Sequence, residues 1–332
     1  GVFLSAGLDS TSLAAIASRV LDKPIRTLTL GFREYEGSPA DEVPIAEAVA
    51  LALGAQHETR WVSGADFAAN ADALLDAMDQ PTIDGVNSYF VSKVAHDSGL
   101  KVALSGLGGD ELLGGYPSFR NVPAMVRLAK PFAWAGKAFR IVSLPVLRRF
   151  TSSKYAGLFE FGGTYGGACL LRRGLYMPWE LPEVLDADLV RAGWQKLAPI
   201  ARLDAALPVG LSPFQAVSAL ELTLYMRQML LRDTDWASMA HSLEVRVPLV
   251  DLELLRTVAA LAAQNGRPPD KKTMARVAWE PQAVPDALVN RPKTGFSVPV
   301  RDWLQKSTGV QERGLRPWAR FVHSRACSYA AR

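Results

Sequence analysis

Cysteine and histidine are scarce in this sequence of 332 residues. The two cysteines, Cys169 and Cys327, lie far apart and match no zinc-binding or redox spacing, which excludes a disulfide framework and a thiol-based redox motif. Isolated thiols are typical of proteins from reducing compartments, so we expect a cytoplasmic protein. The four histidines are scattered and form no metal-binding pattern: His57, His96, His241 and His323.

The sequence also has no long apolar run, no signal peptide and no internal repeat. We therefore expect no membrane-spanning helix and no secretory leader. What is present is an ordinary globular composition, with 49% apolar and 21% charged residues, which is enough for a buried core. The net charge of +4 suits a polyphosphate ligand, but it also suits a solvated surface or weak nucleic-acid contact, so it decides nothing alone.

The first residues read as the end of a buried strand, because Gly1 to Leu4 are apolar and nothing precedes them to pair or cap. This pattern predicts a fragment from which an upstream domain is missing.

Strand and helix patterns alternate through the first third of the sequence. Strand-like segments cover residues 2–5, 25–32, 56–62 and 101–105, and helical periodicity covers residues 8–20, 41–53, 67–78 and 89–97. This alternation predicts an α/β fold with a parallel sheet covered by helices on both faces. Such sheets bind ligands at the carboxyl ends of their strands.

From about residue 123 the pattern becomes helical, most strongly over residues 214–240 and then over 252–263 and 271–279. The glycine-rich segment 157–167 predicts a loop. We therefore predict an α/β core over residues 1–120 and a helical region over residues 121–332 that completes the site.

A short polar motif, Ser5-Ala6-Gly7-Leu8-Asp9-Ser10, follows the first strand and opens the first helix. Small residues allow close approach of a ligand, and the free N–H groups of the helix start attract anions. A carboxylate beside a phosphate is repulsive unless Mg²⁺ bridges the two, so Asp9 predicts a Mg²⁺-polyphosphate ligand. A simple helix N-cap is the equally weighted alternative.

A second motif, Ser105-Gly106-Leu107-Gly108-Gly109-Asp110-Glu111-Leu112-Leu113-Gly114-Gly115-Tyr116, follows another buried strand. Its five glycines allow sharp bends and expose backbone amides, and Asp110 adds a second carboxylate just past a strand end. Two strand-end loops, each with one aspartate, predict a metal held between them. A flexible surface loop is the less favoured alternative.

These two motifs resemble signatures of known enzymes. The first resembles the pyrophosphate loop of the ATP pyrophosphatase superfamily, and the second resembles a signature of glutamine-dependent asparagine synthetases. Residues 231–251 and 293–299 are similar to a third and a fourth block of that family, in the family's order. The resemblance implies a five-stranded parallel sheet of the adenine-nucleotide hydrolase-like type with a helical C-terminal region.

The resemblance also implies residue roles. ATP would contact Leu4, Ser5, Gly7, Asp9, Ser10, Leu30, Ser105, Gly106 and Lys293. Mg²⁺ would bind Asp9 and Asp110, and Lys293 would lie against the α-phosphate, where a mobile point charge can follow developing negative charge. The acceptor side would include Arg232, Asp235, Glu244, Arg246 and Asp251, for which an ion-pair network at helix ends is an equal alternative.

The implied reaction has two steps. A carboxylate, aspartate in the family, attacks the α-phosphorus of ATP and expels pyrophosphate, and ammonia then attacks the β-aspartyl-AMP to give asparagine and AMP. In the family, ammonia comes from glutamine hydrolysis in an N-terminal glutaminase domain, which this chain lacks. We expect no nucleic-acid partner and no membrane partner, and a homodimer is compatible with the sequence.

Two positions depart from the family pattern. Ala6 replaces a glycine, which would add strain of about 1 kcal/mol if the position needed a positive φ. Leu107 stands where asparagine synthetases carry glutamate and β-lactam synthetases carry tyrosine, and leucine can neither move protons nor bind an amine. ATP binding is expected to survive this change, whereas the identity of the acceptor is left open.

Several rival functions remain. The nearest is a β-lactam synthetase-like enzyme that adenylates a different carboxylate, and a tRNA-modifying relative would suit the basic charge. A non-enzymatic scaffold is disfavoured because Asp9, Asp110 and Lys293 are all present. A membrane-surface role could rest on residues 123–150, which mix basic and apolar residues, but Pro131 and Pro145 are expected to break a long amphipathic helix there. A solvated helical face is favoured for this segment.

Overall fold

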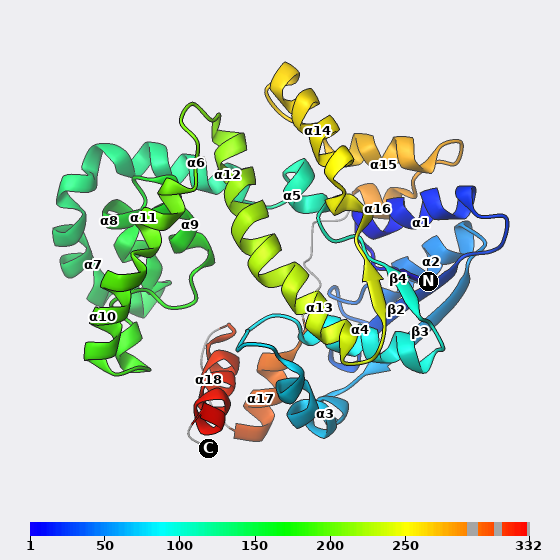
Figure 1. Cartoon of the computed structure of the whole chain (residues 1–332), viewed down its shortest axis with the longest axis horizontal. Coiled ribbons are helices and arrows are strands. Elements are labelled where there is room, and N and C mark those ends of the chain that lie inside the picture. Colours follow the sequence, from blue (N-terminus) through cyan, green and yellow to red (C-terminus); the bar gives the residue numbers. More distant parts are fainter. Residues whose placement is uncertain (291–297, 309–313, 331–332) are drawn as a thin grey trace. The chain divides into compact units, whose positions relative to one another are not determined.

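The computed structural model contains a five-stranded sheet, with all neighbouring strands parallel and the order β3-β2-β1-β4-β5 (Figure 1). The strands are β1 (Val2–Phe3), β2 (Arg26–Phe32), β3 (Gln56–Val62), β4 (Val102–Leu104) and β5 (Glu244–Arg246). The predicted fold class is confirmed. The strand pattern in the sequence found the first four strands but not β5, because two of its three residues, Glu244 and Arg246, are charged and exposed, which leaves no apolar strand pattern.

The structure describes residues 1–290, 298–308 and 314–330. Two compact units can be distinguished, one built from residues 1–113 with 226–332 and the other from residues 114–225. The sheet belongs entirely to the first unit, and the second unit is helical. None of the described helices is long and apolar enough to cross a membrane.

The helices of the first unit mostly begin and end where the sequence pattern places them. Its α-helices are α1 (Leu8–Val20), α2 (Val43–Ala52), α3 (Gly64–Ala77), α4 (Val86–Asp97), α5 (Gly109–Leu113), α13 (Arg232–Met239), α14 (Leu252–Asn265), α15 (Lys271–Trp279), α16 (Asp286–Val289), α17 (Val300–Thr308) and α18 (Arg316–Ala330). Their N-termini follow ordinary capping rules: Ser63 and Asp66 form a capping box on α3, and Asp270 accepts from the first amides of α15.

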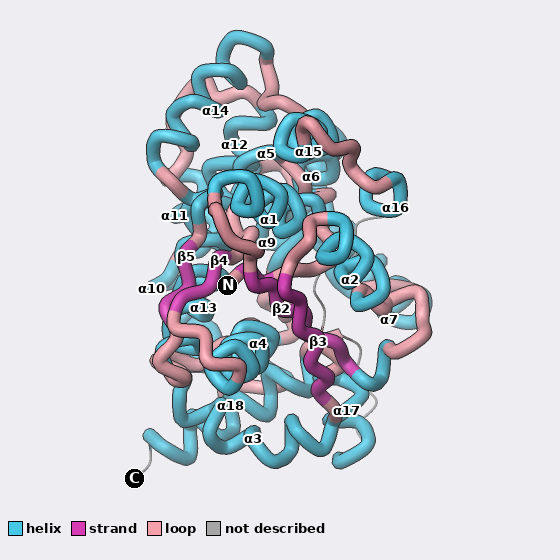
Figure 2. The backbone as a smooth tube through the Cα atoms, turned by 90° about the vertical axis from the view of Figure 1, so that its right-hand side faces the viewer, coloured by secondary structure: helices cyan, strands magenta, loops and turns pink. Residues whose placement is uncertain are grey.

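The sheet is covered on both faces (Figure 2). One face of β2 contributes Leu28, Leu30 and Phe32 to a large apolar core with residues of α3, α4, α13, α17 and α18. On the opposite face, Val2 and Leu4 pack against residues of α1, α2, α15 and α16. Because both faces are covered, Thr27 and Thr29, which alternate with these apolar residues in β2, are buried as well.

The strand order creates a switch point between β1 and β4. From β1 the chain builds β2 and β3 on one side, and then returns to place β4 on the other side of β1. The loops that follow β1 and β4 therefore leave the same edge of the sheet in opposite directions, which is where open α/β sheets bind ligands. These two loops are the two glycine- and aspartate-containing motifs of the sequence.

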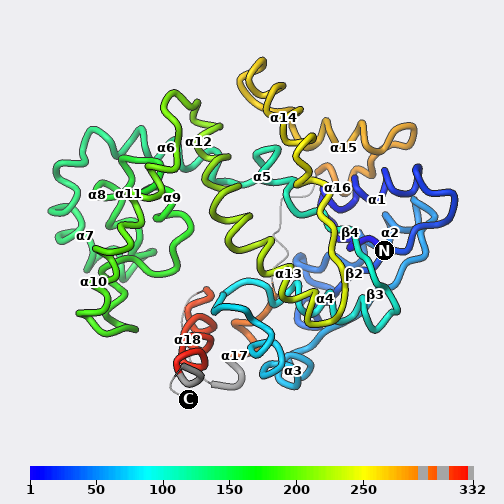
Figure 3. The backbone as a smooth tube through the Cα atoms, in the orientation of Figure 1, coloured from blue at the N-terminus to red at the C-terminus, as the bar shows by residue number. Residues whose placement is uncertain are grey.

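The second unit consists of short helices, traced from green-cyan to green in Figure 3. They are α6 (Ser118–Ala129), the 3-10 helix η2 (Lys130–Ala135), α7 (Gly136–Phe150), η3 (Ser153–Gly157), α8 (Leu158–Phe161), α9 (Tyr165–Arg173), η4 (Leu181–Glu183), α10 (Ala187–Leu197), α11 (Pro199–Ala205) and α12 (Pro213–Leu220). The predicted helix over residues 214–240 is helical throughout, but its middle part, Glu221–Leu231, is a π-helix.

Two predictions for this unit are wrong. Residues 157–167 are not a loop, because most of them belong to η3, α8 and α9. Their glycines serve close packing instead: a Cβ on Gly167 would overlap the carbonyl oxygen of Phe161. Of the two prolines expected to break a long helix, Pro131 does lie in the 3-10 helix η2 that separates α6 from α7, but α7 continues through Pro145 to Phe150.

The two cysteines differ strongly in environment, which gives a first prediction. Burial raises the pKa of Cys169 to about 11, with a further contribution from the carboxylate of Glu221, whereas Cys327 is exposed. Since only the thiolate reacts with alkylating agents, we expect iodoacetamide at pH 8 to label Cys327 at least about tenfold faster than Cys169 in the folded chain. Peptide mass spectrometry after timed quenching measures both rates, and equal rates would contradict the burial of Cys169.

Candidate functional site

The loop after β1 is held in shape by its own side chains. The hydroxyl groups of Ser5 and Ser10 lie 2.9 Å apart, the amide of Ser5 donates to Oγ of Ser10 at 3.2 Å, and the amide of Gly7 donates to Oγ of Ser5 at 3.2 Å. The loop is therefore closed on itself before any ligand binds. Ala6 is buried and is not one of the residues with positive φ, so the strain considered for this position does not arise.

The N-terminus of α1 faces the same place. Its N-cap residue, Gly7, has no side chain and so offers no capping hydrogen bond to the first amides of the helix. Uncapped amides at the positive end of a 13-residue helix attract an anion. Asp9 lies in the first turn, where it places a carboxylate next to this anion site.

The loop after β4 approaches the first loop so closely that only glycine fits. A Cβ on Gly106 would lie 2.7 Å from the backbone nitrogen of Ser10, and a Cβ on Gly109 would overlap the carboxylate of Asp9. Gly108 has φ +96°, which favours glycine for a second reason. The glycines of this motif thus bring the backbone of one strand-end loop against the carboxylate of the other.

Lys271 joins the two loops. Its Nζ donates to the carboxylate of Asp9 and to Oδ1 of Asp110, the latter at 2.5 Å. All three side chains are largely buried. Burial alone would lower the pKa of Lys271, but the two carboxylates more than offset this effect and the pKa is raised above its ordinary value. The lysine is therefore a cation held between two aspartates.

The arrangement brings two carboxylates together around one cation. Two hydrogen bonds to one nitrogen keep the two carboxylate oxygens no more than about 5–6 Å apart. Oxygens bound to one Mg²⁺ lie about 3–4 Å apart, so the ammonium would have to leave before both carboxylates could bind the same ion directly. In the part of the chain that the structure describes, no cluster of three or more His, Cys, Asp or Glu side chains could hold a metal ion. Mg²⁺ does not need such a cluster, since it commonly binds one or two carboxylates and completes its shell with water and substrate phosphates.

The remaining predicted ATP contacts lie around the same strand ends. Leu4 and Leu30 are buried at the ends of β1 and β2, and the carbonyl of Leu4 accepts from the hydroxyl of Thr29 at 2.8 Å. The amide of Ser105 donates to the carbonyl of Arg246 at 2.8 Å, which ties the second loop to β5.

The residues predicted for the acceptor side occupy different surroundings. Arg232 contacts Asp233 at 2.9 Å and Asp79 at 3.6 Å. Glu244 and Arg246 form an exposed ion pair at 2.7 Å on the edge strand β5. Elsewhere, Asp235 is exposed on α13.

Asp251, also predicted for the acceptor side, caps α14 by accepting from two of its first amides, at 2.9 and 3.1 Å. An N-cap of this kind is a structural function, and it does not prevent the residue from supporting the acceptor side.

A buried aspartate in the third sequence block was not predicted. Asp233 accepts hydrogen bonds from Thr82 at 2.7 Å, from the indole of Trp236 at 3.1 Å and from Arg232. Gly85 packs against Trp236 and has φ +86°. This network fixes the segment that leads into α4, and its only sequence signal is an acidic residue at a buried helical position.

Lys271 was also missed by the sequence analysis, although a physical signal was available. Lys271 and Lys272 are the first residues of α15, where the positive end of the helix dipole disfavours basic side chains. A lysine at such a position indicates an acidic partner. The partners lie 262 and 161 residues away in the sequence, so they could not be identified from it. The predicted residue Lys293 lies outside the described residues.

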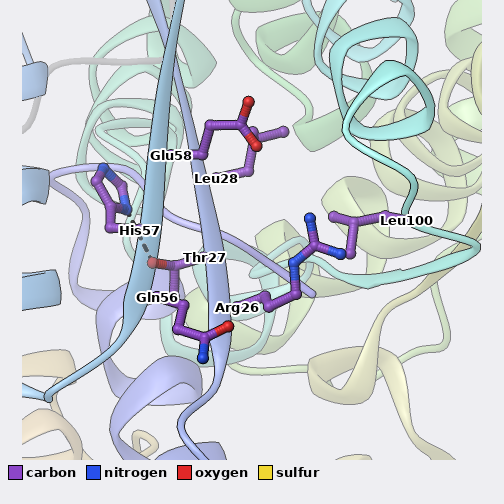
Figure 4. Close-up of a pocket in the computed structure, with 7 residues that line it drawn as sticks. All are labelled: Arg26, Thr27, Leu28, Gln56, His57, Glu58 and Leu100. Atoms are coloured by element: carbon purple, nitrogen blue, oxygen red, sulfur yellow. Dashed lines mark hydrogen bonds between the residues drawn. The ribbon is translucent and has the colours of Figure 1, made fainter.

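A separate hollow lies at the amino ends of β2 and β3 (Figure 4). Its volume is about 210 Å³, and its lining consists of Arg26, Thr27, Leu28, Gln56, His57, Glu58 and Leu100. The guanidinium of Arg26 is occupied by the carbonyl of Ser98 at 2.7 Å, and Nδ1 of His57 lies 2.8 Å from the hydroxyl of Thr27. These groups are used within the fold, and the hollow is at the opposite edge of the sheet from the two aspartates.

Comparisons with known proteins agree with this geometry. The sequence matches the Asparagine synthase family over residues 1–317. A protein of Mycobacterium tuberculosis named "putative asparagine synthetase (glutamine-hydrolyzing)" is 35% identical over 320 residues, which cover 92% of this chain and 46% of that protein.

Asparagine synthetase (glutamine-hydrolyzing) 1 of Bacillus subtilis is 28% identical over 332 residues, which cover 95% of this chain and 49% of that protein. The chain thus spans about half the length of these curated relatives. By its match to the family across both glycine- and aspartate-containing loops, the chain belongs to the asparagine synthase family.

Proposed function

We propose that this chain binds Mg²⁺-ATP at the loops after β1 and β4 and uses it to adenylate a carboxylate for amide synthesis. The observation that carries the proposal is the position of Lys271 between Asp9 and Asp110. Two carboxylates that share one buried cation form a ready site for Mg²⁺. The uncapped start of α1 beside them suits the phosphates.

The chain's residues would then divide the work as follows. Ser5, Gly7 and Ser10, with the first amides of α1, would hold the pyrophosphate part of ATP, and backbone groups at Leu4, Leu30, Ser105 and Gly106 would contact adenosine. Asp9 and Asp110 would bind Mg²⁺, which neutralises phosphate charge when bound. Residues 1–120 would supply the nucleotide site, and residues 121–332 would complete the synthetase site.

Lysine side chains would supply the remaining positive charge. Lys271 would leave the two carboxylates when a divalent ion takes its place, and its ammonium would then be within reach of a phosphate oxygen. Lys293 would lie against the α-phosphate, where positive charge stabilises the pentavalent transition state. Positioning and charge neutralisation would account for most of the catalysis, as is usual in phosphoryl and nucleotidyl transfer.

For the acceptor, we propose aspartate, giving asparagine, AMP and pyrophosphate through β-aspartyl-AMP. The names of the relatives support this assignment. Ammonia would come from glutamine, hydrolysed by a glutaminase domain outside this chain, as the words "glutamine-hydrolyzing" in those names suggest. Arg232, Asp235, Glu244, Arg246 and Asp251 would support the acceptor side.

A second candidate rests on Leu107. This side chain is partly buried between two glycines of the second loop and has no polar atom to contact an amine. A related enzyme that adenylates a different carboxylate would share the nucleotide site and differ only in the acceptor.

The test is pyrophosphate release from Mg²⁺-ATP by the purified chain with ammonium, across a panel of amino acids, with Lys293→Ala measured in parallel. Release that depends on aspartate and is lost in the variant is the expected result. Release with another acid would support the second candidate. No release with any acid while ATP still binds would contradict amide synthesis and leave only the nucleotide site.

A further inference from the structure

The helices α6 and α7 carry an exposed apolar surface that the proposed reaction does not use. It includes Leu128, Phe132, Trp134, Phe139, Ile141, Val142, Val146 and Phe150, which we call the α6–α7 face. Phe132 and Phe139 both pack against Phe159, at 5.6 and 4.8 Å between ring centroids, so the part on η2 is continuous with the part on α7. Exposed apolar surfaces of this kind mark interaction sites.

On α7 the apolar side chains form a stripe. Phe139, Val142, Val146 and Phe150 follow one another at intervals of three and four residues, which places them on one side of the helix. They point to solvent rather than into the unit: Val142 is 77% exposed and Phe150 is 76% exposed. The sequence argument against a long amphipathic helix here was its interruption by Pro131 and Pro145; α7 begins after Pro131 and continues through Pro145.

The segment that carries this face has an excess of basic residues. Residues 112–159 contain eight basic residues and no acidic residue. Arg140 and Arg148 are paired with Glu160 and Glu183. Within the described part of the chain, no carboxylate pairs with Lys137 or Arg149, both of which are exposed. Arg149 lies beside this stripe on α7, two helical turns from Val142, and no carboxylate of the described residues neutralises its charge, whereas Lys137 lies on the other side of the helix.

The charge and shape of the α6–α7 face indicate which kind of partner binds it. A second copy of the chain would place the same face against itself in a two-fold dimer, and basic residues would then meet basic residues. An occupant of negative charge is required. Apolar side chains that project outward from a helix, interspersed with flexible basic ones, suit a fluid anionic surface better than a pocketed protein surface, since lipid needs no matching shape and lysine or arginine can extend to its headgroups.

We propose that the α6–α7 face binds the surface of an anionic lipid bilayer, with α7 lying in the plane of the membrane. Val142, Val146 and Phe150 enter the headgroup–acyl boundary, and Arg149 contacts lipid phosphates. Trp134, which is 87% exposed, lies at the same interface, where indole rings are favoured. The chain is thereby held at a membrane without crossing it, which is independent of the reaction proposed above.

The test is co-sedimentation of the chain with vesicles of phosphatidylcholine alone or with added phosphatidylglycerol, at low and high ionic strength. We expect binding only to the anionic vesicles and weaker binding in salt. The pair Val142→Ser and Val146→Ser is expected to lower the partition coefficient about tenfold or more, since apolar burial is lost. Arg149→Gln is expected to lower it roughly fivefold, and Lys137→Gln, on the other side of α7, is expected to lower it less.

Matched control variants test whether vesicle binding requires the α6–α7 face or only some exposed apolar side chain. Val20→Ser and Leu51→Ser remove apolar side chains that are 74% and 84% exposed on the other unit, and they are expected to leave binding unchanged. Thermal unfolding establishes that every variant is folded, and it does not depend on the proposed reaction. In Trp134→Phe, binding is expected to persist while part of the lipid-induced fluorescence blue shift disappears.

Three results would overturn the proposal. One is failure of the folded chain to sediment with anionic vesicles. Another is sedimentation that the Val142 and Val146 substitutions do not change. The third is binding to an acidic polypeptide such as polyglutamate without binding to vesicles, which would reassign the face to an acidic protein partner.

Discussion

Replacing Lys271 with alanine is expected to lower the rate of pyrophosphate release about 100- to 1,000-fold, because a charge that neutralises phosphate oxygens is removed from a largely buried site. The same substitution removes a cation that binds both Asp9 and Asp110. It is therefore expected to destabilise the ligand-free chain by about 3 kcal/mol, as when one partner of a buried ion pair is removed. Steady-state kinetics and thermal unfolding measure the two effects.

The response to Mg²⁺ distinguishes the loss of the Lys271 charge from a general disruption of the folded structure. In the parent chain the ammonium competes with the metal for the two carboxylates, so Lys271→Ala is expected to bind Mg²⁺ alone more tightly and to regain stability when Mg²⁺ is added. Because the pKa of Lys271 is raised above the unfolded value near 10.4, its stabilising effect is complete at neutral pH and is lost only as pH rises through the folded pKa.

The neighbouring Lys272 provides the control for this substitution. It is exposed at the start of the same helix, and Lys272→Ala is expected to change neither the rate nor the Mg²⁺ affinity by more than about twofold. If Lys271→Ala kept full activity, the lysine would be only a structural counter-ion. The two aspartates would then need another test as metal ligands.

The contrast between Asp9 and Lys271 shows what a sequence can reveal about such a site. Asp9 and Asp110 each lie within a few residues of a buried strand, so their position followed from local pattern and from the rule that ligands bind at the carboxyl ends of parallel strands. Lys271 reaches the same place from α15, through the packing of α15 on α1. No local pattern in the sequence encodes which distant carboxylates a lysine will meet.

Glycine and proline in the second unit illustrate another limit of predicting structure from the sequence. Composition predicted a loop at residues 157–167 and an interrupted helix at Pro145, and both predictions were wrong. Glycines there permit close packing, as at Gly136, where a Cβ would overlap the backbone of Glu160. A glycine within a helix costs only about 1 kcal/mol relative to alanine, and tertiary packing can outweigh this cost.

The second large effect on the rate of pyrophosphate release is expected from Gly109→Ala, which adds only one methyl group. The added methyl group would overlap the carboxylate of Asp9. Because that carboxylate is a side-chain end, it can rotate away and the fold can survive, with a loss of about 1–3 kcal/mol from overpacking. The rotation would move a proposed metal ligand out of position, and a misplacement of about 1 Å can cost 100-fold in rate. We therefore expect pyrophosphate release to fall about 100-fold while the chain remains folded.

Two other glycines make this prediction specific. In Gly106→Ala the methyl group would lie 2.7 Å from the backbone nitrogen of Ser10, which cannot rotate away, so stability is expected to fall together with activity. In Gly193→Ala the methyl group meets nothing within 4 Å in the middle of α10, so stability is expected to stay the same or rise by about 0.5–1 kcal/mol with activity unchanged. Circular-dichroism melting and the pyrophosphate assay on the three variants give the comparison. A Gly109→Ala chain with parental activity would show that the carboxylate of Asp9 can move without loss, and Asp9 would then not be a metal ligand.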